Sequence, residues 1–145
     1  MRRGTVADLE GLLSLEARCF GENEGVFHRR QLRHLLRSPQ AVWFIEGEYE
    51  AAACLLLASN GKSRWGRLYS LSVAPAYRHR GAARLLLEAS FDYLKGLGIT
   101  LCRAEVKSDN VAARGLYASM GFTEGALLAH YYGIGEHGIK LSRRL

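Results

Sequence analysis

The stretch VAPAYRHRGAARLLLEASFDYLKGLG, residues 73–98, contains the end of an apolar strand, a short basic loop and a long helix in immediate succession. The helix is predicted from about Gly81 to Leu97, because apolar residues recur there at helical spacing, and Gly98 supplies the C-cap. The next residues, ITLCRAEV, return as a strand. A strand, a helix and a strand in this order need a crossover connection, so the two strands are expected to lie parallel in one sheet. The chain is therefore predicted to be an α/β protein.

The residues around this unit predict further helices and antiparallel strands. Leucines at helical spacing, after a Thr5–Asp8 pair that resembles a capping box, predict a helix from about Val6 to Cys19. Residues 41–73 read as three consecutive strands with turns near Gly47 and at Asn60-Gly61. The remaining predicted elements are a basic helix over 28–37, a short helix from Asn110 that ends at Gly121, and strands at about 122–129 and 137–144. Together they form a mixed central sheet of about six to seven strands with about four helices.

Chain length and cysteine usage narrow the class of protein. With 145 residues, of which 48% are hydrophobic, the chain can bury a core of its own, and we expect one domain over 1–145. No apolar run is long enough to span a membrane, and acidic residues interrupt the N-terminal region early, so neither membrane insertion nor export is expected. The three cysteines, Cys19, Cys54 and Cys102, are far apart and form no zinc-binding pattern. These features fit reduced thiols in a cytoplasm, and a monomer or homodimer is expected.

The net charge of +6 suits an anionic ligand or partner, although charge by itself governs solubility and steering rather than a specific site. Much of it lies in HRRQLRHLLR, residues 28–37, where the leucines fall on one helical stripe and the arginines mostly fall off it. This segment is either the solvated face of an amphipathic helix or a site for an acidic partner. Specific nucleic-acid binding is not expected, because the basic residues are spread over several elements and no RNP, KH or helix-turn-helix pattern accompanies them.

Several motifs of other enzyme classes are incomplete in this sequence. NGKS at 60–63 lacks the glycine that a P-loop carries five places before Gly61, so a hairpin turn is the better interpretation. GLG at 96–98 lies at the end of a helix and lacks the third glycine of a dinucleotide-binding loop. No G-x-S-x-G occurs, and the five histidines show no ligand spacing. Serine-hydrolase chemistry and a metal cofactor are therefore not expected.

The basic loop at 78–83 combines positive charge with a bare backbone. Because it precedes a helix, its N–H groups are the unpaired donors of a first turn at the positive end of the helix dipole. The small residues from Gly81 to Ala83 let an anion approach these donors. The arginines around them are Arg78, Arg80 and Arg84. From these residues alone, phosphate binding and a purely structural turn are equally good interpretations.

The loop and a second segment together resemble the GNAT acetyltransferase superfamily. The family's coenzyme motif, Q/R-x-x-G-x-G/A between a strand and a long helix, is matched by Arg78, Gly81 and Ala83. Residues 104–122, AEVKSDNVAARGLYASMGF, are similar to the family's second motif. The matching residues there are Asn110, Tyr117, Gly121 and Phe122. Within the superfamily the likeness is greatest to Rim-type alanine N-acetyltransferases, through EVKSDN, LYASMGF and HYYGIG.

The resemblance implies the GNAT fold and acetyl-coenzyme A as cosubstrate. The loop would hold the coenzyme pyrophosphate, and the strand LYSLSV would present backbone groups to the pantetheine arm, with the Val73 N–H stabilising the oxyanion of the tetrahedral intermediate. The expected coenzyme contacts are Leu71, Ser72, Val73, Arg78, His79, Arg80, Gly81, Ala82, Ala83, Arg84 and Asn110. Direct transfer in a ternary complex is expected rather than a cysteine-acyl intermediate.

Glu105 and Tyr117 are the candidate base and acid. Strand alternation puts Glu105 on the face opposite Cys102. The resemblance implies that Glu105 removes the amine proton, and a salt bridge to Arg103, Lys107 or a neighbouring strand is an equal alternative. By the same resemblance, Tyr117 protonates the departing thiolate. The alternative for Tyr117 is a half-buried core residue.

The acceptor is expected to be a protein or peptide amine, with an N-terminal α-amine preferred to lysine. An α-amine titrates roughly two units below lysine, so a single carboxylate can deprotonate it with less help. The likeness to Rim-type enzymes implies that Tyr131 and Tyr132 border the acceptor site, and ordinary edge-covering residues are the alternative for this pair. The second hypothesis for the function is a small-molecule amine acetyltransferase of the same fold.

Overall fold

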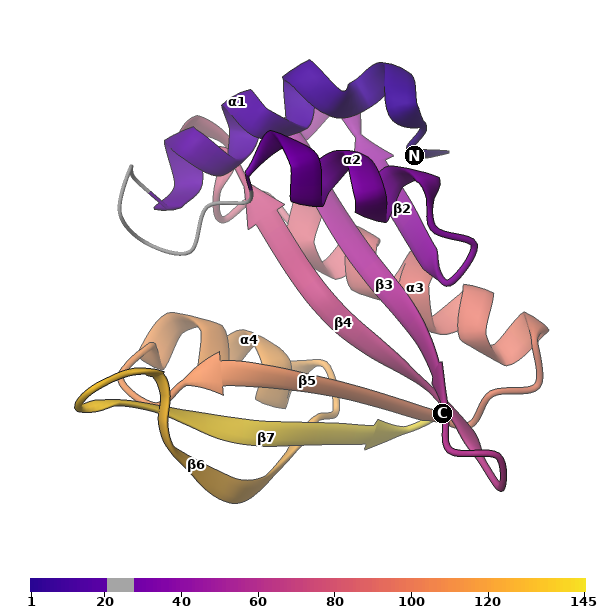
Figure 1. Cartoon of the computed structure of the whole chain (residues 1–145). Coiled ribbons are helices and arrows are strands. Elements are labelled where there is room, and N and C mark those ends of the chain that lie inside the picture. The colour runs from indigo at the N-terminus through magenta and orange to yellow at the C-terminus, as the bar shows by residue number, and fades with distance from the viewer. Residues whose placement is uncertain (21–27) are drawn as a thin grey trace.

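A seven-stranded mixed sheet forms the centre of the protein (Figure 1). The computed structural model describes residues 1–20 and 28–145. The strand order is β1-β2-β3-β4-β5-β7-β6, and every neighbouring pair is antiparallel except β4 and β5, which are parallel. The strands are β1 (Arg2–Arg3), β2 (Ala41–Glu46), β3 (Ala51–Ser59), β4 (Arg64–Val73), β5 (Leu101–Lys107), β6 (Thr123–Gly133) and β7 (Glu136–Arg144).

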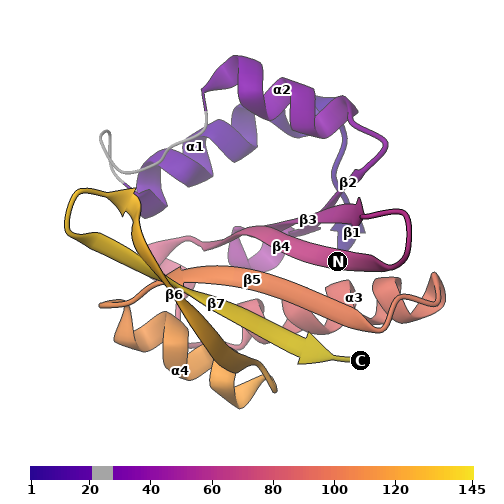
Figure 2. The same cartoon turned by 60° about the horizontal axis from the view of Figure 1, so that its bottom comes forward.

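Helices cover both faces of the sheet. The helices are α1 (Leu9–Phe20), α2 (Arg29–Arg37), α3 (Ala82–Gly96) and α4 (Val111–Ser119), with short 3-10 turns at Val6–Asp8, Gly47–Tyr49 and Pro75–Tyr77. Figure 2 shows α1 and α2 on one face and α3 and α4 on the other. The predicted mixed sheet with about four helices is thus confirmed, and so is the parallel pair on either side of α3. None of the helices in the described ranges combines the length and apolar content needed to cross a bilayer.

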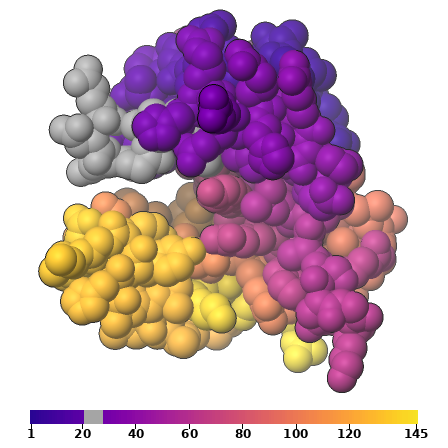
Figure 3. Space-filling model, viewed as in Figure 1, coloured from indigo at the N-terminus to yellow at the C-terminus, as the bar shows by residue number. Residues whose placement is uncertain are grey.

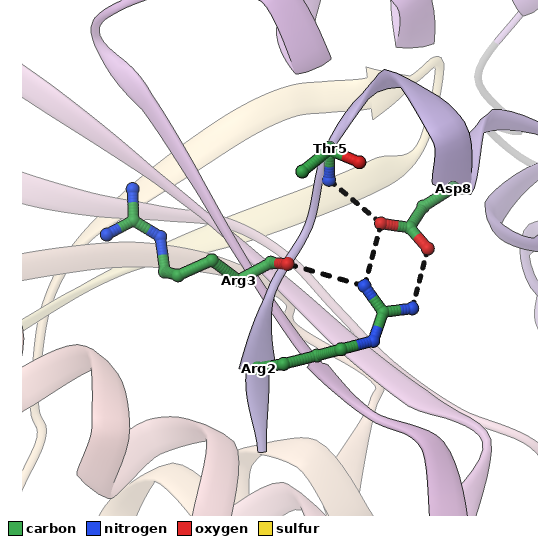
Figure 4. Close-up of polar contacts among 4 residues, drawn as sticks. All are labelled: Arg2, Arg3, Thr5 and Asp8. Carbon is green, nitrogen blue, oxygen red and sulfur yellow. Dashed lines mark hydrogen bonds and ion pairs between the residues drawn. The ribbon is translucent and has the colours of Figure 1, made fainter.

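The N-terminal strand β1 was not predicted, because two arginines carry no apolar pattern. It pairs with β2 through Arg2 and Ile45. Asp8 holds this strand in place, since its carboxylate accepts hydrogen bonds from the Arg2 guanidinium at 2.6 and 3.0 Å and from the Thr5 N–H at 2.8 Å (Figure 4). These bonds lower the pKa of the Asp8 carboxyl, the Arg2 bond contributing most. The predicted start of the first helix is therefore a 3-10 turn over Val6–Asp8, and α1 begins only at Leu9.

Apolar side chains form one core on each face of the sheet. The core on the α3 side contains Leu55, Leu68, Leu86, Leu87, Phe91, Leu94, Cys102, Ala104, Val106, Tyr117, Met120 and Phe122, among others. The core on the α1 side contains Leu9, Leu12, Leu15, Leu32, Trp43, Ala52, Cys54 and Ala74. Helix α3 lies unusually close to β4, because a Cβ on Gly66 would stand 2.5 Å from Leu94. Glycine is therefore needed at position 66 for the helix to pack this closely.

Strand β4 contains a bulge at Tyr69. The adjacent residues Cys54 and Leu55 of β3 pair with Ser70 and Leu68 of β4, so β4 has one extra residue at this point. A bulge of this kind bends the strand and increases its local twist. It lies two residues beyond Arg67, the last residue of β4 that pairs with β5.

The bulge reverses the alternation of side chains along β4. Leu68 and Leu71 both pack in the core on the α3 side, although residues three apart in a regular strand face opposite ways. The same reversal turns Ser70 and Ser72 toward α1, where both hydroxyls donate to one carboxylate oxygen of Glu16 at 3.2 Å. Glu16 is only 3% exposed, and burial raises the pKa of its carboxyl.

The raised pKa of Glu16 predicts how stability changes with pH. An acid whose pKa is raised by folding contributes stability below its unfolded value, near 4.5, and this contribution is lost as the pH rises through the folded pKa. Glu16→Gln keeps an oxygen acceptor for both serines without a charge, so we expect it to raise the melting temperature at pH 8 and to change it much less at pH 4.

Glu10→Gln on the same helix is the matched control. The pKa of Glu10 is lowered, chiefly by its hydrogen bond with Arg29, so its removal should show the opposite dependence on pH. Thermal unfolding of the three proteins at both pH values measures the effect. If Glu16→Gln shifted the melting temperature equally at pH 4 and pH 8, this would contradict a Glu16 carboxyl group whose pKa is raised by burial.

Candidate active site

Strands β4 and β5 separate after only two paired positions, and this separation opens the middle of the sheet. Gly66 pairs with Cys102 and Arg67 with Arg103. Beyond these pairs the two strands diverge, as Figure 1 shows, and the space-filling view shows a hollow between the two halves of the molecule on the same side (Figure 3). Within the described ranges no strand pairs with the freed edge of β4, so its backbone groups can bind a ligand.

The backbone of β4 at Val73 points toward this opening. The Val73 carbonyl accepts hydrogen bonds from the Arg78 Nε at 3.1 Å and the Cys19 Sγ at 3.3 Å rather than from β3, whereas the next N–H, of Ala74, donates to Glu50 on the β3 side. In a strand the N–H and C=O of one residue point to the same side, and successive residues alternate. The N–H groups of Val73 and of the residue two places before it therefore face the opening.

The side chains of Leu71 and Val73 lie on the opposite face of the sheet from the side chain of Ser72. Leu71 and Val73 pack against the core on the α3 side, whereas the Ser72 side chain turns toward α1 and bonds Glu16. The backbone N–H groups of Leu71 and Val73 thus face the opening, while their side chains pack against the core. This placement agrees with the backbone role implied by the family resemblance, which stays a prediction.

The basic loop after β4 leaves a row of backbone donors without acceptors. From His79 to Arg84, no acceptor in the described part of the chain pairs with the backbone N–H groups. Gly81, at φ +85°, and His79, at φ +65°, adopt the left-handed conformation, which turns consecutive amides toward one side of the loop. A Cβ on Gly81 would meet no protein atom within 4 Å. The space beside the loop is therefore open to a ligand.

The three arginines predicted around the loop have different surroundings. Arg78 is bound to the end of β4, as described above, and the Arg80 guanidinium lies 5.6 Å from the centre of the Tyr77 ring. Arg84 crosses to α4, where it donates to the Ser119 hydroxyl at 3.0 Å. Arg80 is thus the loop arginine with no hydrogen-bond acceptor among the described residues. Of the small residues in the loop, Ala82 is buried and Ala83 is partly exposed.

Asn110 caps α4, as predicted. Its side-chain oxygen accepts the Ala113 N–H at 3.0 Å. This cap fixes the start of the helix that bears Tyr117. The contact between Asn110 and the coenzyme, which the family resemblance implies, stays a prediction.

An ion pair joins the two diverging strands at the point where they separate. The Arg67 Nε of β4 lies 3.1 Å from the Glu105 carboxylate of β5. A second nitrogen of Arg67 donates to the Tyr131 hydroxyl at 3.0 Å. The salt bridge to a neighbouring strand, the alternative foreseen for Glu105, is thus present. Glu105 nevertheless remains 18% exposed on the open face, opposite buried Cys102, so it stays accessible to an acceptor.

Tyr117 of α4 is buried in the core on the α3 side of the sheet. Its ring packs edge-on to Phe122 with centroids 5.4 Å apart. Burial raises the pKa of its hydroxyl above the usual 10, and nearby Tyr132 and Glu105 add to the shift. The hydroxyl is therefore protonated at neutral pH and lies close enough to both groups to respond to their charge. The charge of Glu105 reaches the Tyr117 hydroxyl, and the roles predicted for the two residues stay predictions.

The hairpin between β6 and β7 carries the predicted acceptor residues. Tyr131 and Tyr132 are 46% and 37% exposed, and their rings are perpendicular with centroids 4.9 Å apart. Both lie over Gly138, where a Cβ would stand 3.0 Å from the Tyr132 ring. Two histidines hold the tip of the hairpin, because His137 Nδ1 accepts the His130 N–H at 3.0 Å and His130 Nδ1 accepts a further backbone N–H. Burial and the neighbouring Glu105 raise the pKa of Tyr132 to about 12.

Sequence reasoning missed Arg67 and Glu16. Arg67 alternates with aromatic residues in a strand, and only the parallel register of β4 and β5 shows that it faces Glu105. Glu16 resembles any polar residue on an amphipathic helix, and nothing in the sequence shows that it is buried. Burial raises the pKa of Cys54 and Cys102 to about 12, which disfavours the reactive thiolate form of both. Among the described residues, no cluster of three or more His, Cys, Asp or Glu side chains could hold a metal ion.

The chain belongs to the GNAT family of acetyltransferases, whose family model matches residues 9–122. It is 30% identical over 138 residues to the mycothiol acetyltransferase of Beutenbergia cavernae, a match that covers 88% of this chain and 46% of that protein. It is 38% identical over 84 residues to the N-alpha-acetyltransferase RimI of Mycobacterium tuberculosis, covering 53% of this chain and 51% of that one. The chain thus spans about half the length of these relatives.

The fold is that of solved GNAT proteins. The structure of Arabidopsis thaliana NAA60 in complex with acetyl-CoA matches with a TM-score of 0.84 and 18% identity, covering 99% of this chain and 97% of that one. At this low identity the match concerns the fold alone. The GNAT fold predicted from the two motifs is confirmed.

Proposed function

We propose that this chain transfers the acetyl group of acetyl-coenzyme A to a primary amine, and that the acceptor is the N-terminal α-amine of a protein or peptide. The observation that carries the proposal is the freed edge of β4 beside the unpaired amides of the basic loop, with the Glu105 carboxylate held by Arg67 where β4 and β5 separate. Family membership supports acetyl transfer, and a relative named N-alpha-acetyltransferase RimI supports an α-amine acceptor.

The coenzyme is proposed to lie along β4 with its pyrophosphate at the loop. The unpaired amides from His79 to Arg84 would bind phosphate oxygens, with the helix dipole of α3 adding to the attraction. The pantetheine arm would bond the freed edge of β4. The thioester oxygen would then meet the Val73 N–H, and a donor aimed at the developing oxyanion lowers the barrier by typically about 3 kcal/mol.

The chemical step needs one base and one acid. The amine nitrogen attacks the thioester carbon, the carbon–nitrogen bond forms and the carbon–sulfur bond breaks. Glu105, directly or through a water, takes the proton from the amine, and Tyr117 gives a proton to the departing thiolate. Because burial raises the pKa of Tyr117, its hydroxyl keeps its proton at neutral pH and has a proton to give. Tyr131 and Tyr132 border the acceptor, and Arg67 fixes the Glu105 carboxylate.

A small-molecule amine is the second candidate for the acceptor. The match to mycothiol acetyltransferase covers 88% of this chain, more than the 53% covered by the match to RimI.

As for compartment, the three free cysteines fit a reducing cytoplasm, where we propose that the enzyme acts. One chain contains every group in the proposed mechanism, so a monomer or a homodimer could carry it out.

The acceptor class is tested by thiol release from acetyl-coenzyme A. We expect robust turnover of a lysine-free peptide with a free N-terminus, and little turnover of a blocked peptide with an internal lysine, because the α-amine loses its proton more easily. Polyamines, amino acids and aminoglycosides complete the panel. Turnover of a small amine with neither peptide used would favour the second candidate.

The loop is tested by Gly81→Val. We expect the affinity for acetyl-coenzyme A to fall by roughly tenfold or more, because the side chain would shield amides that form charge-assisted hydrogen bonds. Gly61→Val is the matched control, since Gly61 has φ +86° against +85° for Gly81 and a Cβ at either position meets no protein atom within 4 Å. Calorimetric titration measures the affinity of each variant for the coenzyme, and thermal unfolding measures its stability. Together they separate a loss of binding from a loss of folding. Equal affinities would remove the loop from the coenzyme site.

Tyr117→Phe tests the proton donor. We expect coenzyme binding to persist and kcat to fall by about a hundredfold, because only the hydroxyl is lost. Tyr93→Phe is the control, as Tyr93 packs against Phe44 on the core side of α3, away from the opening. Wild-type turnover by Tyr117→Phe, with chemistry rate-limiting, would assign the residue to packing.

A further inference from the structure

A second hollow lies between α2 and the bulge of β4. It has a volume of about 400 Å³ and is lined by Arg30, Gln31, His34, Leu35 and Tyr69. We call it the α2 pocket. Four of its five lining residues come from one short helix, and the fifth is the extra residue that the bulge inserts into β4. The bulge residue Tyr69 therefore forms one wall of the α2 pocket.

Tyr69 connects the α2 pocket to the proposed acceptor site. Its ring centre lies 5.2 Å from the Arg67 guanidinium, which in turn contacts Glu105 and Tyr131. Tyr69 is two residues beyond Arg67 in β4, a distance of about 7 Å along a strand. A peptide whose α-amine lies at Glu105 would therefore reach the pocket with about its second to fourth residue.

The charge of the α2 pocket is positive. Helix α2 carries four arginines and no acidic residue. Arg29 is paired with Glu10, and Arg33 acts on the same carboxylate. Among residues 1–20 and 28–145, no ion pair joins Arg30 to an acidic side chain. A carboxylate is the group that best complements this guanidinium.

We propose that the α2 pocket binds an acidic side chain near the N-terminus of the acceptor, so that the protein acetylates polypeptides with Asp or Glu at about the second to fourth position. This inference rests on the proposed function. Arg30 would bind the carboxylate, and the apolar surfaces of Leu35 and Tyr69 would pack against the peptide chain. A basic acceptor would meet like charge in the pocket, so the pocket also excludes such peptides.

The test uses lysine-free peptides with a free N-terminal alanine that differ only at the second to fourth positions, which hold Asp, Asn or Arg. With saturating acetyl-coenzyme A, thiol release gives kcat/KM for each. We expect the Asp peptide to exceed the Asn peptide by roughly tenfold or more and the Arg peptide to be the poorest. The preference should weaken as salt is raised from about 50 to 500 mM, because exposed charges are screened.

Three variants distinguish binding in the α2 pocket from attraction to the overall positive charge of α2. Arg30→Gln should remove the preference, so that this variant uses the Asp and Asn peptides with similar kcat/KM. Arg37→Gln removes the same charge from an exposed position of α2 outside the pocket and should retain the preference. Arg30→Glu should reverse it in favour of the Arg peptide. Circular dichroism and thermal unfolding confirm that each variant is folded.

The outcomes distinguish the two levels of the proposal. Equal use of all three peptides by the wild type, or loss of the preference in Arg37→Gln as much as in Arg30→Gln, would overturn the α2 pocket and leave N-terminal acetylation standing. Turnover of small amines without use of any peptide would overturn the proposed function itself. A preference for the Arg peptide in the wild type would show that the charge of α2 does not select the acceptor.

Discussion

The short parallel contact between β4 and β5 is the constraint on which the site depends. The crossover through α3 brings the two strands together, and Gly66 lets α3 pack tightly against β4 where they pair. The bulge at Tyr69 then bends β4 away, which leaves a strand edge open in the middle of a sheet. Unpaired backbone groups there are unfavourable unless something binds them. The incomplete sheet thus leaves backbone groups of β4 available to a ligand.

Each half of the molecule fixes one side of this opening. On the β4 side, Glu16 bonds the strand after the bulge, and Arg78 and Cys19 bond the Val73 carbonyl. The bulge therefore cannot relax without leaving a buried carboxylate without its partners. On the β5 side, the core under Tyr117 holds α4 against the sheet. The Arg67–Glu105 ion pair joins the two sides at the point of separation.

The coenzyme and acceptor sides of the opening are built from different kinds of structure. The proposed coenzyme side is backbone at a strand edge and a helix start, which depends little on side-chain identity. The proposed acceptor side is made of side chains from α2, β4, β5 and the β6–β7 hairpin. The family match ends at residue 122, before Tyr131 and Tyr132.

The sequence by itself determined the order of elements, the parallel unit around α3, the glycine-containing loop and the N-cap at Asn110, because each depends on residues close together in the chain. It also indicated Glu105 and Tyr117, through the motif they share. The tertiary structure alone decided that Arg67 faces Glu105, that Glu16 is buried beneath the bulge, and that Tyr69 forms a wall of the α2 pocket. These facts depend on strand register, and a one-residue bulge reverses every later side chain without leaving a pattern in the sequence.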